Sequence, residues 1–243
     1  MQPDEYRKMA EVEDAMWYYK SVHGHMRRGL EHHLKSQPAR ILDAGCGSGG
    51  LIRRLAPLQP AWSWQGLDYS PLACALARER CTAEIREGSL LDLPYEDGRF
   101  AAITSVDVLC QVKDPRTALA EIHRCLAPGG TAVVNVPAYK WLWSYHDEAV
   151  QSEHRFTRPE MIALFREAGF RVLRSTYWNM LPFPLVVLRR KVFPPAHPTS
   201  DVSLFPRPVE AGFNALMAVE HAWLGTGGRL PFGSSVLTVA QKS

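Results

Sequence analysis

From Ala39 onward, the sequence alternates short apolar runs with segments of helical periodicity. The apolar runs occupy residues 39–46, 63–70, 83–90, 100–109 and 129–138. Helix-start signals lie between them: Ser70-Pro71 and Asp114-Pro115 each place a capping side chain before a proline at the first helical position. Because strands that alternate with helices form parallel βαβ units, this pattern predicts an α/β fold with a doubly wound, mostly parallel sheet.

Segments of a different kind flank this alternation. Residues 11–36 carry apolar side chains at helical spacing and predict one or two N-terminal helices. Downstream, the sequence predicts a helix at 157–170, a strand at 171–179, a helix at 209–225 and a last strand at 234–242. We therefore expect four parts: an N-terminal helical cap (1–38), a core (39–180), a proline-rich lid and helix (181–233), and a final core strand (234–243).

Composition and charge argue against several classes of protein. The five cysteines form no C-x-x-C pair, so they indicate neither a disulfide framework nor a cysteine zinc site, and we expect no metal. The net charge of +3, without a long basic stripe, gives no sign of a nucleic-acid partner. The polar N-terminus lacks a signal-peptide pattern, and no apolar run reaches the ~20 residues that span a bilayer. These features favour a cytoplasmic protein.

A glycine-rich turn, LDAGCGSGG (42–50), follows the first predicted strand. Ligands of open parallel sheets bind at the carboxyl ends of the strands, and glycines let a ligand approach the backbone because no Cβ intervenes. Asp68 ends the second predicted strand, where a carboxylate can accept the hydroxyl protons of a ribose. Asp92 follows the third, where it could accept a hydrogen bond from an adenine amine. Together these residues predict an adenosine-containing ligand.

Two classes of adenosine ligand fit this arrangement, dinucleotides and S-adenosylmethionine. The spacing from Gly45 to Gly50 matches the dinucleotide pattern G-x-G-x-x-G. A diphosphate, however, needs a helix N-terminus without a neighbouring acidic group, and Asp43 stands two residues before Gly45. That carboxylate suits the amino group of a methionine moiety, so the turn favours S-adenosylmethionine. An NAD(P)-dependent oxidoreductase stays as the alternative.

Within residues 39–138, the chain resembles class I S-adenosylmethionine-dependent methyltransferases of the type 11 group. The resemblance rests on four ordered segments: ILDAGCGSGG, GLDYS, GSLLDLPYEDGRFAAITSVDVL and LAPGGTAVVNVP. It implies a seven-stranded, Rossmann-like sheet with an antiparallel last strand. It also implies a cofactor site that consists of Asp43, Ala44, Gly45, Cys46, Gly47, Asp68, Tyr69, Leu91, Asp92, Leu93 and Ser105.

The resemblance implies a contact for each part of the cofactor. The methionine moiety would contact Asp43, Gly45 and Gly47, and the ribose would contact Asp68. The adenine would contact Tyr69, Asp92 and Leu93, and the methyl donor would face Ser105. One position departs from the family pattern. Many members carry a histidine pair after the fourth strand, whereas this chain has Cys110-Gln111 there. Because Gln111 cannot act as a base, a non-catalytic binding protein with this fold stays open as a further alternative.

Residues 139–156 are rich in aromatic side chains and histidines and are candidates for the acceptor side. Aromatic rings could wall an apolar acceptor or face a sulfonium, and a histidine can act as a base near neutral pH. Tyr139, His146 and His154 are the candidate catalytic residues, although each could instead pack the loop or form a solvated turn. The sequence thus predicts in-line methyl transfer to an O, N or C atom of a small aromatic or apolar acceptor.

A proline-rich segment at 181–208 has two interpretations. It carries Arg189, Arg190, Lys191 and Arg207 against Asp201, a net charge of +3. Apolar residues beside three consecutive basic ones could make a peripheral contact with an anionic membrane. We favour a lid over the acceptor pocket, because long loops in compact domains often serve as lids. Both a monomer and a homodimer are compatible with the sequence.

Overall fold

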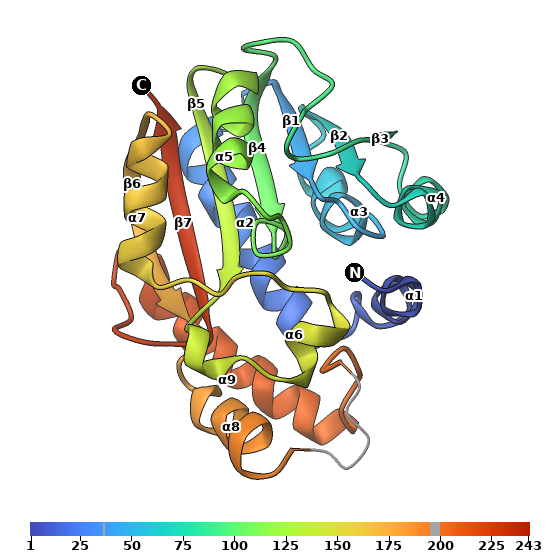
Figure 1. The fold of residues 1–243 in the computed structure, drawn as a ribbon, viewed down its shortest axis with the longest axis vertical. Coiled ribbons are helices and arrows are strands. Elements are labelled where there is room, and N and C mark those ends of the chain that lie inside the picture. The colour runs from blue at the N-terminus through green and yellow to red at the C-terminus, as the bar shows by residue number, and fades with distance from the viewer. Residues whose placement is uncertain (36, 195–199) are drawn as a thin grey trace.

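A computed structural model describes residues 1–35, 37–194 and 200–243. Its centre is a seven-stranded sheet in the order β3-β2-β1-β4-β5-β7-β6, drawn in Figure 1. The strands are β1 (Ala39–Ala44), β2 (Trp62–Asp68), β3 (Glu84–Glu87), β4 (Phe100–Val106), β5 (Leu126–Pro137), β6 (Phe170–Trp178) and β7 (Ser235–Lys242). The strands β1 to β5 run parallel, and β7 is antiparallel to both β5 and β6. The sheet confirms the predicted α/β fold and its antiparallel last strand.

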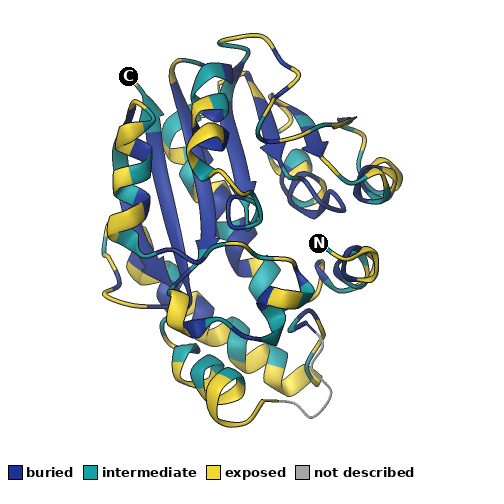
Figure 2. Ribbon diagram, viewed as in Figure 1, coloured by how far each residue is buried: buried dark blue, intermediate teal, exposed yellow. Residues whose placement is uncertain are grey.

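Helices cover both faces of this sheet. One face carries α2 (Trp17–Leu34), α3 (Gly50–Leu55) and α4 (Pro71–Arg80), and the other carries α5 (Pro115–Cys125) and α7 (Arg158–Glu167). Neighbouring residues of a strand point to opposite faces, so Ile41 joins the core on the α2 side and Leu42 the core on the α5 side. Both side chains are fully buried. Figure 2 accordingly shows the sheet as a buried layer between helices with exposed outer surfaces.

The helices begin at the predicted capping residues. Ser70 Oγ accepts a hydrogen bond from the backbone of Ala73 at the start of α4. Asp114 accepts two backbone hydrogen bonds at the start of α5. Thr157 and Glu160 form a capping box at the start of α7, within the segment predicted as a helix. Local sequence chemistry therefore positions the helices that follow the strand ends.

The N-terminal segment forms two helices in different places. In α1 (Pro3–Val12), Tyr6 hydrogen-bonds Asp68 at the end of β2, and Met9 packs over the glycine turn after β1. In contrast, α2 packs directly on the sheet through Met26 and Leu30. The helix α1 is thus the part of this segment that caps the strand ends, and α2 belongs to the core layers.

The C-terminal cap is a group of helices beyond the carboxyl ends of the strands (Figure 1): η2 (Lys140–Leu142), α6 (Tyr145–Ala149), α8 (Phe183–Val187), a π-helical turn (Leu188–Val192) and α9 (Arg207–Gly225). The short helix η1 (Ala56–Leu58) follows α3 instead. The prolines Pro182 and Pro184 stand at the start of α8, where proline is tolerated in a helix. Residues 195–199 of the predicted lid lie outside the described residues.

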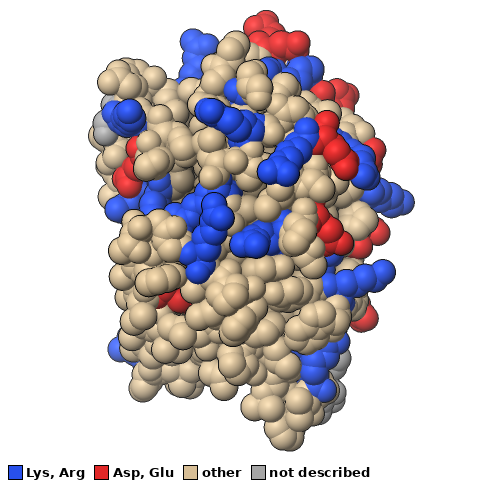
Figure 3. All heavy atoms as spheres, turned by 90° about the vertical axis from the view of Figure 1, so that its left-hand side faces the viewer, with Lys and Arg blue, Asp and Glu red and all other residues tan. Residues whose placement is uncertain are grey.

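The surface of the cap differs from that of the sheet end. Figure 3 shows charged side chains gathered over the upper part of one face and few of them at the lower end, where the C-terminal helices lie. Within residues 1–35, 37–194 and 200–243, no helix combines the length and apolar character needed to span a membrane.

Candidate functional site

A cavity of about 820 Å³ opens at the carboxyl ends of β1, β2 and β4. Open parallel sheets bind their ligands at this edge. The wall combines the strand ends with α1, α2 and the C-terminal cap, so segments far apart in the sequence meet there. The predicted cofactor residues that line the cavity are Asp43, Gly45, Cys46, Gly47, Asp68, Tyr69 and Leu91.

Glycines shape the turn between β1 and α3. Gly45, Gly47 and Gly49 have φ angles of +85°, +52° and +81°, which residues with side chains rarely adopt. A Cβ on Gly45 would also collide with the side chain of Val108, and one on Gly47 would meet Met9 Cε at 2.6 Å. The turn therefore brings bare backbone to the cavity at positions that a larger residue could not occupy.

Asp43 lies near the carboxyl end of β1 and is almost completely buried at the cavity wall. Thr104 Oγ1 donates a hydrogen bond of 2.9 Å to its carboxylate. Burial raises the pKa of Asp43 to about 7, and the bond from Thr104 opposes only part of that shift. A cationic group in the cavity would favour the ionised carboxylate, so Asp43 is suited to hold one.

Asp68 ends β2 and ties the glycine turn to α1. Its carboxylate accepts hydrogen bonds from the backbone N–H groups of Gly47 (2.9 Å) and Ser70 (3.0 Å) and from the hydroxyl of Tyr6 (3.3 Å). Burial raises the pKa of Asp68 despite these bonds. The positions of Tyr6 and Met9 at the cavity could not be predicted from the sequence, because a helical pattern does not say where a helix docks.

Four predicted cofactor residues lie outside the cavity lining, namely Ala44, Asp92, Leu93 and Ser105. Ser105 is fully buried inside β4 and is not part of the cavity lining. Because β3 ends at Glu87, residues 88–91 line the cavity instead, Asp92 is exposed to solvent and Leu93 packs in the core. These four residues thus lie outside the cavity lining, and their expected contacts with the cofactor stay predictions.

Asp107, which was not among the predicted site residues, follows β4 and lines the cavity. Its carboxylate accepts hydrogen bonds from the Tyr18 hydroxyl (2.8 Å) and Asn135 Nδ2 (2.8 Å). Trp178 Nε1 in turn donates to Asn135 Oδ1 at 2.7 Å, so α2, β5 and β6 together hold this carboxylate. The signal that could have found it is an acidic residue directly after the fourth strand.

Two further properties single out Asp107. Its φ angle is +56°, an uncommon backbone conformation for a non-glycine residue and one that clusters at functional sites. Burial raises the pKa of Asp107 to about 6, while the hydrogen bonds from Tyr18 and Asn135 counteract that rise. Its carboxylate is therefore mostly ionised at neutral pH and can accept a proton.

The structure brings one of the three candidate catalytic residues to the cavity. His146 lines it, with Nδ1 accepting a hydrogen bond from the backbone of Asp201 at 3.1 Å. Burial, reinforced by Arg190, lowers the pKa of His146 to about 4. Tyr139 stacks on Tyr177 outside the cavity lining, with ring centroids 5.1 Å apart.

His154 also lies outside the cavity lining. Its Nε2 is 3.4 Å from the backbone oxygen of Lys113, and its ring packs at a tilt beside Phe156. The loop at 139–156 thus divides between packing residues and cavity residues. Which of its residues line the cavity could not be predicted from the sequence, because the segment combines η2, α6 and irregular backbone.

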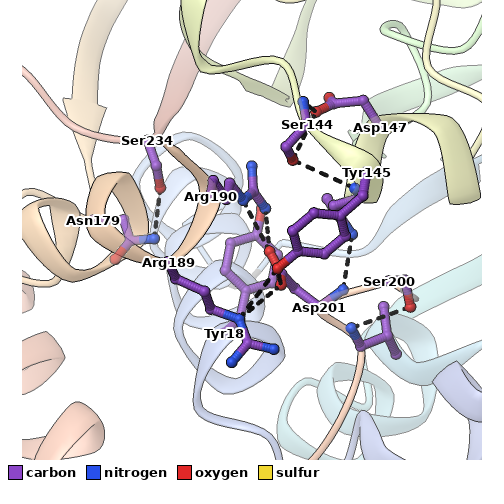
Figure 4. Close-up of polar contacts among 12 residues, drawn as sticks. Tyr18, Ser144, Tyr145, Asp147, Asn179, Arg189, Arg190, Ser200, Asp201 and Ser234 are labelled. Carbon is purple, nitrogen blue, oxygen red and sulfur yellow. Dashed lines mark hydrogen bonds and ion pairs between the residues drawn. The ribbon is translucent and has the colours of Figure 1, made fainter. Parts of the chain in front are cut away.

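Ion pairs join the cap to the rest of the cavity wall. Asp147 and Arg155 form a fully buried pair at 2.6 Å. Asp201 accepts from Tyr145 Oη at 2.7 Å and pairs with Arg189 and Arg190, as Figure 4 shows. Burial acts to raise the pKa of Asp201, yet the charge of Arg190 and its other partners lowers it to about 2. These contacts fasten α6 and the π-helical turn over the cavity.

Comparison with known proteins places the cofactor side in a family. A family described as "Methyltransferase domain" matches residues 42–134. The demethylmenaquinone methyltransferase of Thermus thermophilus is 38% identical over 113 residues, which cover 44% of this chain and 51% of the relative, so the chain spans about half the length of that relative. The demethylmenaquinone methyltransferase of Lactiplantibacillus plantarum is 31% identical over 194 residues, which cover 65% of this chain and 81% of the relative. This chain belongs to the class I methyltransferase family.

The methyltransferase fold extends beyond the matched segment. A chain from the solved complex that contains the Haloferax volcanii Trm112 methyltransferase activator superposes with a TM-score of 0.65 at 23% identity, covering 98% of this chain and 93% of that chain. The family match at 42–134 includes Asp43, Asp68 and Asp107, whereas His146 lies beyond it. Because the family match ends before the cap, the acceptor side of this methyltransferase family member is inferred from the geometry of its own cavity residues.

Proposed function

We propose that this protein transfers a methyl group from S-adenosylmethionine to a small, largely apolar acceptor. The observation that carries the proposal is a single cavity that contains the buried carboxylates of Asp43 and Asp68 together with that of Asp107. The carboxylates of Asp43 and Asp68 suit the polar groups of the cofactor, and that of Asp107 is suited to accept a proton from the acceptor. Membership of the methyltransferase family supports the same reaction class.

The residues around the glycine turn fit the cofactor. When bound, S-adenosylmethionine supplies an electrophilic methyl group on a sulfonium. Asp43 would pair with its ammonium group, and Asp68 would accept hydrogen bonds from its ribose hydroxyls. Tyr69 and Leu91 are the candidates for the adenine contacts, since both line the cavity beyond Asp68 in the sequence. The bare backbone of the turn leaves space for the methionine moiety.

The protein's own contribution to the reaction is alignment, exclusion of water and removal of a proton. Holding two reactants in line can lower the barrier by about 7–11 kcal/mol. Asp107 would accept the proton that an acceptor hydroxyl, amine or activated carbon loses, and its pKa of about 6 makes it competent at neutral pH. Tyr18 and Asn135 orient this carboxylate. His146 is a weaker candidate base, because its pKa is lowered to about 4.

The acceptor side of the cavity supports an apolar substrate. Trp17 and Phe213 stack with ring centroids 4.7 Å apart, and both line the cavity with Val186 and Phe205. The relatives named above act on demethylmenaquinone by their names. We extend to this chain only the broader class, a small molecule with a large apolar part.

A methyl-transfer assay tests the proposal. Purified protein is incubated with methyl-labelled S-adenosylmethionine and a panel of phenols, quinones and other apolar small molecules, and products are followed by mass spectrometry. We expect an acceptor that gains one labelled methyl group. Asp107→Asn should lower turnover by about 10²- to 10⁴-fold with little change in cofactor affinity.

Asp114→Asn is the matched control, because Asp114 is an exposed helix cap outside the cavity. If Asp107→Asn turns over acceptor as fast as Asp114→Asn, the proposed role of Asp107 is wrong. If wild-type protein binds no S-adenosylmethionine, the proposed reaction itself is wrong.

A further inference from the structure

Exposed apolar side chains are concentrated on one part of the described chain. Most of the large hydrophobic residues that are exposed belong to residues 181–232: Leu181, Leu185, Leu188, Val192, Phe193, Leu204, Val209, Leu216, Val219, Trp223 and Phe232. We call the exposed side chains of residues 181–232 the cap surface. Apolar patches of this kind usually mark a site of interaction with a protein or a membrane.

The helix α9 gives the cap surface its extended apolar face. Val209, Leu216, Val219 and Trp223 are exposed at intervals that place them along the outer side of the helix. Between residues 211 and 225, the one charged residue of the sequence is Glu220. A helix that is apolar on its outer as well as its inner side is not adapted to water alone.

The acidic residues of α9 are used inside the protein. Glu220 is only 2% exposed and accepts hydrogen bonds from the backbone of Asn179 (2.8 Å) and Leu181 (2.6 Å). Glu210 accepts from the backbone of Trp17 (2.9 Å) and Phe205 (3.0 Å). Neither carboxylate therefore makes the outer side of the helix polar.

The charge that the cap surface presents is basic. Arg189, Lys191 and Arg207 are exposed beside its apolar residues. Asp201, the acidic residue of the same segment, is largely buried and engaged with Arg189 and Arg190. An apolar area with an excess of exposed basic side chains matches an anionic lipid surface, where apolar groups enter the acyl boundary and basic groups meet the headgroups.

We propose that the cap surface docks on an anionic lipid bilayer. Trp223 supports this occupant, because amphipathic indole rings favour the membrane interface. A second copy of the chain fits less well, since a two-fold interface buries the same patch on both subunits and would bring basic side chains together.

Leu185, Leu188 and Phe193 are exposed and also line the cavity. If the proposed methyl transfer holds, an apolar acceptor could pass from lipid to the cavity along these residues.

Vesicle co-sedimentation of the full chain, without cofactor or acceptor, tests the docking separately from the reaction. We expect binding to vesicles of mixed phosphatidylglycerol and phosphatidylcholine, weaker binding at high salt, and little binding to phosphatidylcholine alone. The double variant Leu216→Glu/Val219→Glu should lower the partition coefficient about tenfold or more. Arg207→Glu should lower it about fivefold or more.

Leu58→Glu is the matched control, because Leu58 is an exposed apolar residue in η1, outside the cap. It should bind vesicles like the wild type, and circular dichroism should show every variant folded. Absent binding, equal binding to phosphatidylcholine alone, or undiminished binding of Leu216→Glu/Val219→Glu would each overturn the proposal. If the wild type fails to bind vesicles and forms a dimer in sedimentation velocity that this double variant dissociates, the occupant of the cap surface is a second copy of the chain.

Discussion

At the residue scale, the buried carboxylates of Asp43 and Asp68 and the partly buried one of Asp107 determine what the cavity can do. Burial raises the pKa values of Asp43, Asp68 and Asp107, and each carboxylate is held by a different set of donors. Carboxyl groups with raised pKa values change their charge when a cation or a proton donor arrives. The site is thus built to respond to ligands near neutral pH, although no histidine is required for that response.

The Tyr18 hydroxyl controls the protonation of Asp107. Its hydrogen bond favours the ionised carboxylate, so Tyr18→Phe should raise the pKa of Asp107 above its present value of about 6. In a pH profile of kcat, the acid limb should therefore move to higher pH by up to about one unit, while the rate at high pH changes little. An unmoved acid limb would show that another group is the base.

We expect Asp43 to make cofactor binding depend on pH. In the empty cavity its pKa is raised to about 7, so below that pH the carboxyl is mostly protonated and must release its proton to pair with an ammonium. Affinity for S-adenosylmethionine should fall as pH decreases below 7, by up to about tenfold per unit. Calorimetric titration at several pH values measures this slope, and Asp43→Asn should bind weakly with a reduced slope. A carboxyl group with this pKa titrates within about pH 5 to 8. A wild-type affinity that does not change over that range would contradict this role of Asp43.

At the element scale, the turn after β1 and the helix α1 create the cofactor side together. The turn could be predicted from LDAGCGSGG, because glycine spacing after a strand has a local physical cause. The position of α1 could not, because the bond from Tyr6 to Asp68 joins residues 62 apart in the sequence. The same limit applies to Asp107, whose donors come from α2 and β5.

Gly45→Ala tests the turn. Gly45 combines a φ of +85° with the close approach of Val108, so alanine would be both strained and in collision. We expect loss of S-adenosylmethionine binding and a decrease in the free energy of unfolding greater than the ~1–3 kcal/mol of backbone strain alone. Gly227→Ala is the control, since Gly227 has a φ of +91° with no neighbouring atom within 4 Å. It should lose stability but keep its cofactor affinity, as measured by denaturation and calorimetry.

At the scale of the whole molecule, the strand and helix alternation was sufficient to predict the sheet, because each element is specified by its own apolar periodicity and caps. The cavity was predictable on the side that the strand ends provide, where Asp43 and Asp68 lie at the carboxyl ends of β1 and β2. On the acceptor side, Tyr139 and His154 were placed by composition alone, and tertiary packing directs them away from the lining. Only the assembled fold brings α1, α2 and the cap to the same cavity.

The central claim is that the cavity binds S-adenosylmethionine through Asp68 and not a dinucleotide. Isothermal titration calorimetry with S-adenosylmethionine and with NAD tests it on wild type, Asp68→Ala and Asp92→Ala. Asp92 is the matched control, an exposed carboxylate outside the cavity lining. We expect wild type and Asp92→Ala to bind S-adenosylmethionine alike and NAD not at all, and Asp68→Ala to bind about tenfold or more weakly. Preferential binding of NAD, or an unchanged affinity in folded Asp68→Ala, would contradict the account.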